Sequence, residues 1–160
     1  MCYYFFMKRY LSPTVAVLLL TALVWLVINR GPAAIPLTIG GETLYVELAE
    51  TEDEWSLGLG GRKSMKEGRG MLYVFPKPHF YVFNMKDMLF PLDIIWINKD
   101  KKIVDVMTNV GPETYPEFSY VNDFLAQYVL EVNAGFFDAH GVQIGDIVEF
   151  SLEDTEEERD

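Results

Sequence analysis

The chain has 160 residues, half of them apolar and 14% aromatic, enough to build the core of one globular domain and too much for a disordered chain. All 24 Asp and Glu residues lie after residue 30, against 10 of the 13 Lys and Arg residues, so residues 31–160 carry a net charge of −14. Such a domain repels nucleic acid and anionic lipid surfaces, so we expect no nucleic-acid partner, and solubility explains the acidity itself.

Residues 10–28 (YLSPTVAVLLLTALVWLVI) form an uncharged apolar segment near the N-terminus. As a helix they would extend about 28 Å, close to the roughly 30 Å hydrocarbon core of a bilayer. Lys8 and Arg9 precede the segment and Arg30 closely follows it, so the positive-inside rule places residues 1–9 in the cytoplasm. We therefore expect a single-pass anchor in the cell membrane, with the following domain on the extracytoplasmic side.

A cleaved signal peptide is the alternative interpretation of this segment. The stretch that follows, NRGPAAIP, lacks an A-x-A cleavage site, which favours an uncleaved anchor. Cys2, the single cysteine, permits neither an intrachain disulfide nor a thiolate metal cluster. Its place beside the predicted anchor leaves lipidation and an inert thiol both open.

Residues 29–34 are predicted to be a linker, residues 35–152 a globular β domain, and residues 153–160 (EDTEEERD) a disordered acidic tail. Within the domain, alternating apolar residues predict a strand over residues 44–48. Thr51 opens the sequence TEDEW, a capping-box pattern that predicts a helix of two turns ending at the glycines that follow.

The remaining pattern predicts six short strands, over residues 70–75, 80–85, 93–98, 103–110, 127–132 and 147–152. The first two flank Pro76 and Pro78 and are predicted to pair antiparallel, and the next two flank the turn NKDKK. A second short helix follows its predicted cap, Asn133, and ends at Gly141. Short strands at this spacing, with two short helices, predict a mostly β domain, a compact antiparallel sandwich or barrel.

Four stretches of the domain carry a family resemblance: ETEDEWSLGLGGRKSM, GRGMLYVFP, FNMKDMLFPLDIIWI and QYVLEVNAGFFDAHGVQIGDIV. In this order, over residues 46–150, they resemble the domain of unknown function 192 family, an uncharacterised membrane-protein group of bacteria and archaea. The resemblance implies a compact β fold of jelly-roll-like type, often behind a signal sequence or a membrane anchor. It implies no settled activity.

The family's motif in the third stretch corresponds here to Met85, Lys86, Pro91, Leu92 and Asp93. The sequence departs from that motif at residue 84, an Asn where an aromatic residue is common, and at residues 87–88, which read Asp-Met in place of Asn-Thr. In the first stretch residues 58, 61 and 62 (Gly, Gly and Arg) match, and a Gly stands at residue 60 where Met is usual.

Charged residues within apolar strands form the candidate site. Burying an unpaired charge costs several kcal/mol, so such a residue either faces water or is held by partners. This predicted cluster consists of Arg62, Lys86, Asp93 and Glu131. If Lys86 and Asp93 face inward from neighbouring strand ends, the forked guanidinium of Arg62 can bind a carboxylate beside them. With Met85 and Pro91 of the family motif, the cluster would bind an anionic or polyhydroxyl ligand. The alternative is a buried salt-bridge network that fixes strand register.

Signals for catalysis are weaker, and the catalytic residues stay unknown. His79 and His140 are isolated and predict no metal site. No nucleophile elbow, P-loop or dinucleotide fingerprint is present, and no cofactor is predicted. Asp93 with Glu131 forms a carboxylate pair of the kind that glycosidases use, at a separation that the sequence does not define.

Aromatic residues are the other candidate for recognition, and several are close together in the sequence: Tyr73, Phe75, Phe80, Tyr81, Phe83, Phe90 and Trp96. Some must pack in the core, and the others suit stacking on a sugar or docking of a protein. We therefore expect a binding or accessory module for a small polar ligand, a glycan or an envelope protein. The alternatives are an envelope hydrolase that uses Asp93 with Glu131 or Lys86, and a purely structural component of a membrane complex.

Overall fold

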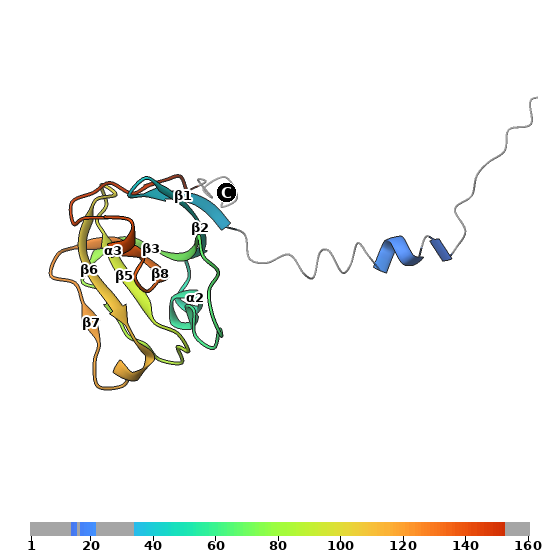
Figure 1. Cartoon of the computed structure of the whole chain (residues 1–160), viewed down its shortest axis with the longest axis horizontal. Coiled ribbons are helices and arrows are strands. Elements are labelled where there is room, and N and C mark those ends of the chain that lie inside the picture. The colour runs from blue at the N-terminus through green and yellow to red at the C-terminus, as the bar shows by residue number, and fades with distance from the viewer. Residues whose placement is uncertain (1–13, 16, 22–33, 153–160) are drawn as a thin grey trace, which may run out of the picture. The chain divides into compact units, whose positions relative to one another are not determined.

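The computed structural model describes residues 14–15, 17–21 and 34–152 (Figure 1). The chain divides into two units, residues 1–33 and 34–160. In the first unit the described residues 14–15 and 17–21 are helical. None of the helices that the structure describes has the length and apolar character needed to cross a membrane. The predicted anchor over residues 10–28 falls largely outside the described residues, and the segments over residues 1–9 and 153–160 fall entirely outside them.

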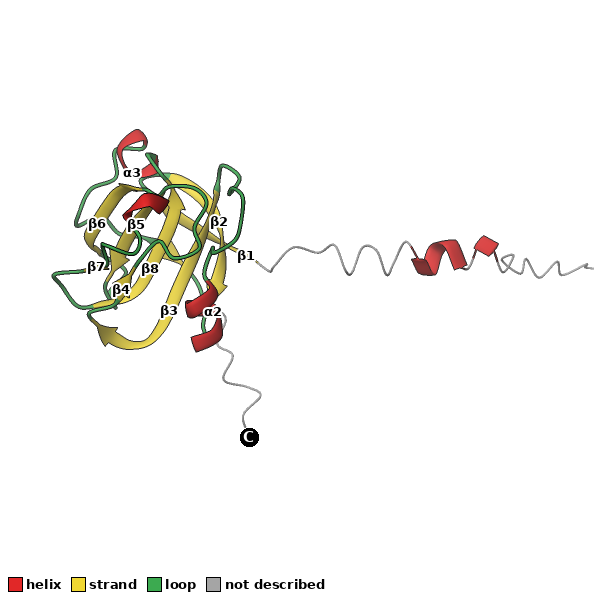
Figure 2. Ribbon diagram, turned by 90° about the horizontal axis from the view of Figure 1, so that it is seen from below, coloured by secondary structure: helices red, strands yellow, loops and turns green. Residues whose placement is uncertain are grey.

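Over its described residues, 34–152, the second unit is mostly β with two short α-helices, as predicted (Figure 2). Its elements are β1 (Ala34–Ile39), β2 (Glu42–Ala49), α2 (Glu52–Leu57), β3 (Arg69–His79), β4 (Val82–Phe83), β5 (Leu92–Ile97), β6 (Ile103–Val110), the 3₁₀-helix η1 (Pro112–Thr114), β7 (Tyr120–Val121), β8 (Ala126–Asn133), α3 (Phe136–Ala139) and β9 (Glu149–Phe150). β1 begins at Ala34, so the chain is already in the sheet at the end of the predicted linker.

Seven strands form one sheet in the order β6-β5-β8-β3-β2-β1-β9, and β4 and β7 form a separate ribbon. The hairpin of β5 and β6 is antiparallel, as predicted, whereas β2 and β3 pair in parallel. The prediction of a wholly antiparallel domain is therefore wrong at this pair. A parallel pair needs a crossover connection, and α2 with the loop after it provides one.

The predicted pairing of residues 70–75 with residues 80–85 is also wrong. β3 pairs instead with β2 and β8, and β4 pairs with β7. Pro76 and Pro78 lack the backbone N–H that a sheet ladder needs. The register between β3 and β8 shifts between Val74 and His79, across these two prolines. The prolines thus interrupt the ladder of a long strand and do not turn a tight hairpin.

The sheet is curled (Figure 2). The chain entering β9, at one edge, meets the start of β6, at the opposite edge. The N–H of Ile103 donates to the Asp146 carbonyl at 2.9 Å, and the N–H of Val148 donates to the Lys101 carbonyl at 2.8 Å. These bonds join two edges that would otherwise expose unpaired backbone groups. Because this contact is a single bridge, Lys102 opposite Ile147, and not a ladder, the sheet as a whole is a curled half-barrel.

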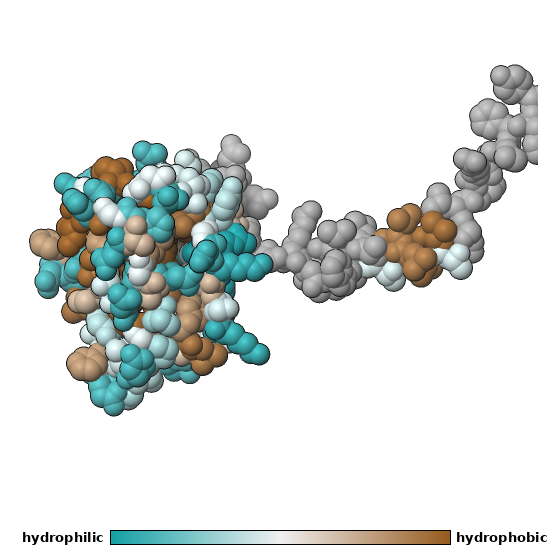
Figure 3. Space-filling view, viewed as in Figure 1, coloured by the Kyte–Doolittle hydropathy of each residue, from teal (hydrophilic) through white to brown (hydrophobic). Residues whose placement is uncertain are grey.

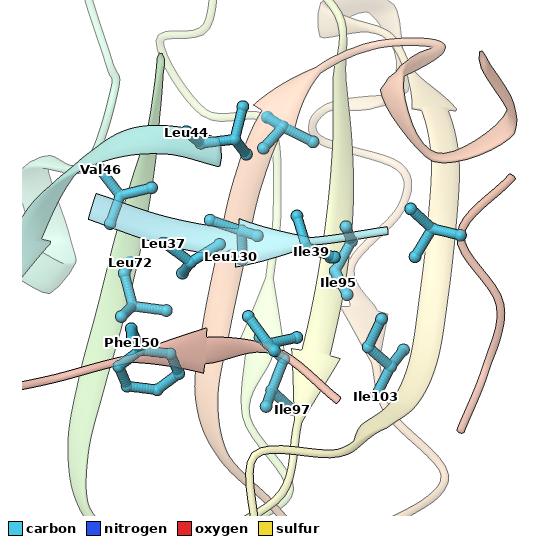
Figure 4. Packing of buried hydrophobic residues seen from close by; sticks show 13 residues of the cluster. Leu37, Ile39, Leu44, Val46, Leu72, Ile95, Ile97, Ile103, Leu130 and Phe150 are labelled. Carbon is cyan, nitrogen blue, oxygen red and sulfur yellow. The ribbon is translucent and has the colours of Figure 1, made fainter. Parts of the chain in front are cut away.

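Two hydrophobic cores cover the two faces of this sheet. The first lies inside the curl and includes Leu37, Leu72, Ile95 and Leu130 (Figure 4). The second lies on the other face and includes Trp96, buried with no exposed surface. All six residues of β5 are buried because the strand lies between β6 and β8 and is covered on both faces. The outer face seen in Figure 3 is largely hydrophilic, with hydrophobic side chains in scattered groups.

Candidate functional site

A hollow of about 290 Å³ opens on the second face of the sheet, between α2, β3, β4 and β8. We call it the aromatic hollow. Its lining residues are Trp55, Ser56, Leu57, Gly58, Leu59, Gly60, Tyr73, Phe75, Tyr81, Val82, Phe83, Asn84, Lys86, Met88 and Glu131. Two residues of the predicted cluster, Lys86 and Glu131, are among them.

The helix on one side of the hollow begins as the sequence predicts. The Thr51 side chain accepts from the Glu54 N–H, and the Glu54 carboxylate accepts in return from the backbone N–H of Thr51. Hydrogen bonds from the N–H groups of Glu50 and Thr51 hold the pKa of the Glu54 carboxyl below its usual value. This capped turn brings Trp55 over β2, where its indole N–H donates to the Ala49 carbonyl at 2.8 Å.

Glu131 is the buried carboxyl of the hollow, 5% exposed. The Tyr73 hydroxyl donates to its Oε2 at 2.9 Å, and no described residue donates to its Oε1. In the described part of the chain, every fully buried side-chain nitrogen or oxygen has a hydrogen-bond partner. Oε1 is therefore accessible from the hollow that Glu131 lines.

Burial raises the pKa of the Glu131 carboxyl to about 7, against the opposing effects of the Tyr73 hydrogen bond and the Arg62 charge. Burial, with the nearby Glu131 charge, also raises the pKa of the Tyr73 hydroxyl far above its usual value. Tyr73 is thus always a hydrogen-bond donor, whereas Glu131 changes charge near neutral pH. A carboxyl of this kind can accept or donate a hydrogen bond to a ligand.

The wall of the hollow is aromatic. Phe75 stacks on Tyr81, with ring centroids 3.5 Å apart, and contacts Trp55 at 5.0 Å. Phe83 meets Tyr73 edge-on at 4.8 Å. The Tyr81 hydroxyl donates to the Lys77 carbonyl, so it is engaged within the protein, like the indole N–H of Trp55. These rings therefore offer hydrocarbon surface to the hollow.

Arg62 binds Glu47 and not the predicted partners. Its Nη1 and Nη2 donate to the two carboxylate oxygens of Glu47, each at 2.7 Å. This fork raises the pKa of the Arg62 guanidinium, with a smaller contribution from the Glu131 charge. Arg62 thus lies outside the lining, and its positive charge acts on the Glu131 carboxyl from a distance.

Asp93 is fully buried, and three backbone N–H groups satisfy its carboxylate. Oδ1 accepts from Asn109 at 2.8 Å and from Gly135 at 3.1 Å, and Oδ2 accepts from Phe137 at 2.9 Å. Since the described residues form no ion pair between Lys86 and Asp93, the predicted pair beside Arg62 is wrong. Asp93 ties the end of β6 to the start of α3, which is a structural role.

The register of β5 on β8 also separates Asp93 from Glu131. Asp93 is opposite Val132 and Ile94 is opposite Glu131. Paired residues share a face and successive residues alternate, so the two carboxylates lie on opposite faces of the sheet. They cannot act together on one substrate, and the predicted glycosidase-like pair is wrong.

The other predicted site residues have diverse surroundings. Lys86 is exposed at the hollow, and no described residue forms an ion pair with it. Met85 is buried in the second core, away from solvent. Pro91 is exposed outside the hollow lining, and its carbonyl accepts from the Ala134 N–H at 3.4 Å.

The whole β domain matches one family. Residues 35–150 match the sequence profile of DUF192, described as "Uncharacterized ACR". The chain belongs to the DUF192 family. Residues 35–150 cover most of the 160-residue chain and contain the whole aromatic hollow.

Two solved structures resemble this DUF192 chain. One is a protein of unknown function from Novosphingobium aromaticivorans DSM 12444, with 30% identity, 76% of this chain and 88% of that chain covered, and a TM-score of 0.70. The other is a putative transcription regulator from Sinorhizobium meliloti 1021, with 31% identity, coverage of 76% and 97%, and a TM-score of 0.70. A comparison with curated proteins yields no match.

Sequence reasoning missed two residues of this DUF192 site, Tyr73 as the partner of Glu131 and Gly58 beside it. A Cβ on Gly58 would lie 2.3 Å from the Tyr73 hydroxyl oxygen, and the residue has a φ of +47°. Alternation along β3 does put Tyr73 and Phe75 on one face. That they share this face with Glu131 follows only from the pairing of β3 with β8.

The histidines and the acidic residues give no second site. His79 and His140 each contact a nearby backbone carbonyl through Nδ1, those of Phe80 and Phe136. Over the described residues, no group of three or more His, Cys, Asp or Glu side chains is placed to hold a metal ion. A further hollow of about 380 Å³ beside α3 is lined by Glu42, Glu67 and Arg69, all exposed. None of the described residues that line it is a buried charged side chain.

Proposed function

We propose that this DUF192 domain is a binding module that holds a small polar ligand in the aromatic hollow, with Glu131 as the main polar contact. The observation that carries the proposal is the Glu131 carboxyl, which is buried yet has one oxygen accessible from the hollow. Most of the carboxyl is held in the protein interior, and the one oxygen that no described residue contacts opens into the hollow. A ligand hydroxyl or N–H in the hollow can donate to this oxygen.

The size and composition of the hollow support a small ligand. Ligand pockets are typically about 300–1,000 Å³ with mostly apolar walls and a few polar groups. The aromatic hollow, at about 290 Å³, lies at the lower limit of that range. Its walls are aromatic, and its charged lining residues are Lys86 and Glu131.

Binding accounts for the hollow better than hydrolysis does. A glycosidase-type reaction needs two carboxyl groups on either side of the scissile bond. Glu131 is the single carboxyl among the residues that line the hollow, and Asp93 is on the other face of the sheet.

The Sinorhizobium protein is described as a putative transcription regulator. For this chain, the net charge of −14 over residues 31–160 argues against DNA as the ligand.

The proposal is tested by screening the full chain against a library of small polar molecules and mapping each hit by amide NMR shifts. We expect hits that perturb the amides of Gly58 and Phe83 and that bind more weakly to Glu131→Gln. Glu67→Gln, at the other hollow, is the matched control and should bind as the wild type does. Hits that map elsewhere, or that bind Glu131→Gln equally well, would refute a ligand site at Glu131.

We also propose that residues 10–28 anchor this domain in the cell membrane with the domain outside the cytoplasm. The charge-free apolar sequence supports this. So do Val17, Leu18, Leu19 and Leu20, each 59–67% exposed in the described helical residues. Reporter fusions after Asp160 provide the test. An alkaline phosphatase fusion should be active and a green fluorescent protein fusion dark, and the reverse pattern would overturn the orientation.

A further inference from the structure

We infer that the ligand of the aromatic hollow is an uncharged polyhydroxyl ring, a sugar or a cyclic polyol, that stacks on the aromatic wall and hydrogen-bonds to Glu131 and Lys86. This inference rests on the proposed function, because it names the chemical class of ligand for the same site. Three features of the hollow carry it, namely its charge balance, its hydrogen-bonding groups and its apolar wall.

The two charged residues that line the hollow have opposite signs, so they favour neither a net positive nor a net negative ligand. Lys86 and Glu131 are its charged lining residues, and Arg62, paired with Glu47, lies outside the lining. A ligand with a single charge would find an opposite charge in one of these two groups and a like charge in the other. Like charges at close range destabilise a complex, and an uncharged ligand avoids this repulsion.

The polar groups of the hollow match a row of hydroxyls. Glu131 Oε1 can accept a hydrogen bond, and the exposed Lys86 ammonium can donate one. The Asn84 side chain also lines the hollow. Its Oδ1 accepts from the Lys86 N–H at 3.0 Å, and no described acceptor takes up its NH₂ group. A hydroxyl both donates and accepts. Neighbouring hydroxyls on one ring can therefore donate to the Glu131 carboxyl and accept from the Lys86 ammonium and the Asn84 NH₂ group.

The wall matches the C–H face of a ring. Trp55, Tyr81 and Phe83 are half-buried, so part of each ring is exposed. The indole N–H of Trp55 and the hydroxyl of Tyr81 are already bonded to backbone carbonyls, so the surface that these rings present is hydrocarbon. A ligand with one apolar face and a polar edge therefore fits better than one that is polar all round.

The test uses one ring in three charge states: glucose as the neutral form, glucuronate as the anion and glucosamine as the cation. Galactose, mannose, N-acetylglucosamine and myo-inositol extend the set to other arrangements of the ring hydroxyls. Binding to the full chain is measured by saturation-transfer NMR and calorimetry at pH 7. We expect at least one neutral ring to bind, and to bind about tenfold or more tightly than its charged analogues.

Two variants probe the contacts. Lys86→Met should weaken binding of the neutral ring about tenfold and, since Lys86 is exposed, should fold normally. Trp55→Leu should weaken it by a similar factor through lost stacking, while Glu67→Gln leaves it unchanged. Because Lys86→Met tests the polar contact without touching the core, the inference does not depend on the folding of a buried variant.

The outcomes separate this inference from the proposed function. If only amines or only carboxylates bind at the hollow, the ligand class is wrong and the binding module stands. If neutral rings bind with the same affinity to Lys86→Met and Trp55→Leu, they do not occupy the hollow and the inference fails. If no molecule of any class in the wider library binds there, both proposals fall.

Discussion

Asp93 and Glu131 are on adjacent strands, one step apart in register, yet their carboxylates face opposite sides of the sheet. The Asp93 carboxylate accepts hydrogen bonds from three backbone N–H groups. The Glu131 carboxyl accepts one, from the Tyr73 hydroxyl, and its other oxygen is open to the hollow. Two buried carboxyls that look alike in the sequence thus have different tasks. Asp93 stabilises the fold, and Glu131 is available to a ligand.

Replacing Asp93 by Ala should destabilise the protein strongly. Three N–H groups, from Asn109, Gly135 and Phe137, would lose their acceptor, so we expect a loss on the order of 3–5 kcal/mol in the free energy of unfolding, measured by urea denaturation. Asp100→Ala, at an exposed ion pair, should change stability by no more than about 0.5 kcal/mol. Equal stabilities of the two variants would show that Asp93 has no such structural role.

Replacing Glu131 by Gln should remove a pH dependence of stability. The pKa of Glu131 is raised in the folded state to about 7 from 4.5, so the folded state binds the proton more tightly than the unfolded state does. Its contribution to the free energy of unfolding is therefore full below pH 4.5 and is lost as the pH rises towards 7. Since one pKa unit corresponds to about 1.4 kcal/mol, the loss is on the order of 3 kcal/mol.

The measurement for Glu131 is urea denaturation of wild type and Glu131→Gln at pH 5, 6, 7 and 8. The difference between the two proteins isolates Glu131 from the other carboxylates. We expect the wild type to lose stability relative to the variant with each step up to about pH 7, and the difference to level off above that. A difference that stays constant from pH 5 to 8 would contradict a raised pKa at Glu131.

Arg62 should tune Glu131 from outside the hollow. Its positive charge lowers the pKa of Glu131, so Arg62→Met should raise that pKa, and Arg62→Lys, which keeps the charge, should raise it less. The carboxyl carbon of Glu131, followed by NMR during a pH titration, reports the change. Because the Arg62 side chain is 36% exposed, losing its pair with Glu47 should cost about 1 kcal/mol or less. An unchanged Glu131 titration in Arg62→Met would exclude this coupling.

Gly58 and Gly61 provide a matched pair of substitutions beside the hollow. Both have positive φ, +47° and +74°, so alanine is strained at either position. A Cβ on Gly61 meets nothing within 4 Å, whereas a Cβ on Gly58 collides with the Tyr73 hydroxyl. We expect Gly61→Ala to cost about 1 kcal/mol and Gly58→Ala about 1–3 kcal/mol more, in thermal or urea unfolding. Similar losses in the two variants would mean that Tyr73 moves away without cost.

Local patterns in the sequence predicted several elements correctly. The capping box at Thr51 and Glu54 forms as expected, since it needs only groups three residues apart. The hairpin of β5 and β6 is confirmed, because a short turn leaves adjacent strands little choice of partner. β1 was missed, although Gly40-Gly41, both at positive φ, is the turn that joins it to β2. Asn133 does not cap α3. Its amide donates to the Met65 carbonyl at 3.1 Å, and Gly135 precedes the helix.

The sequence by itself determined the family, the mostly β character, the acidic charge and the two residues of the predicted cluster that line the hollow, Lys86 and Glu131. Only the tertiary structure decided that Arg62 binds Glu47, that Tyr73 donates to Glu131 and that Asp93 belongs to the other face. The reason is physical. Alternation fixes which residues of one strand share a face, but a one-residue change in register between strands reverses which faces meet. That register depends on packing between residues as far apart as Tyr73 and Glu131, which no local pattern records.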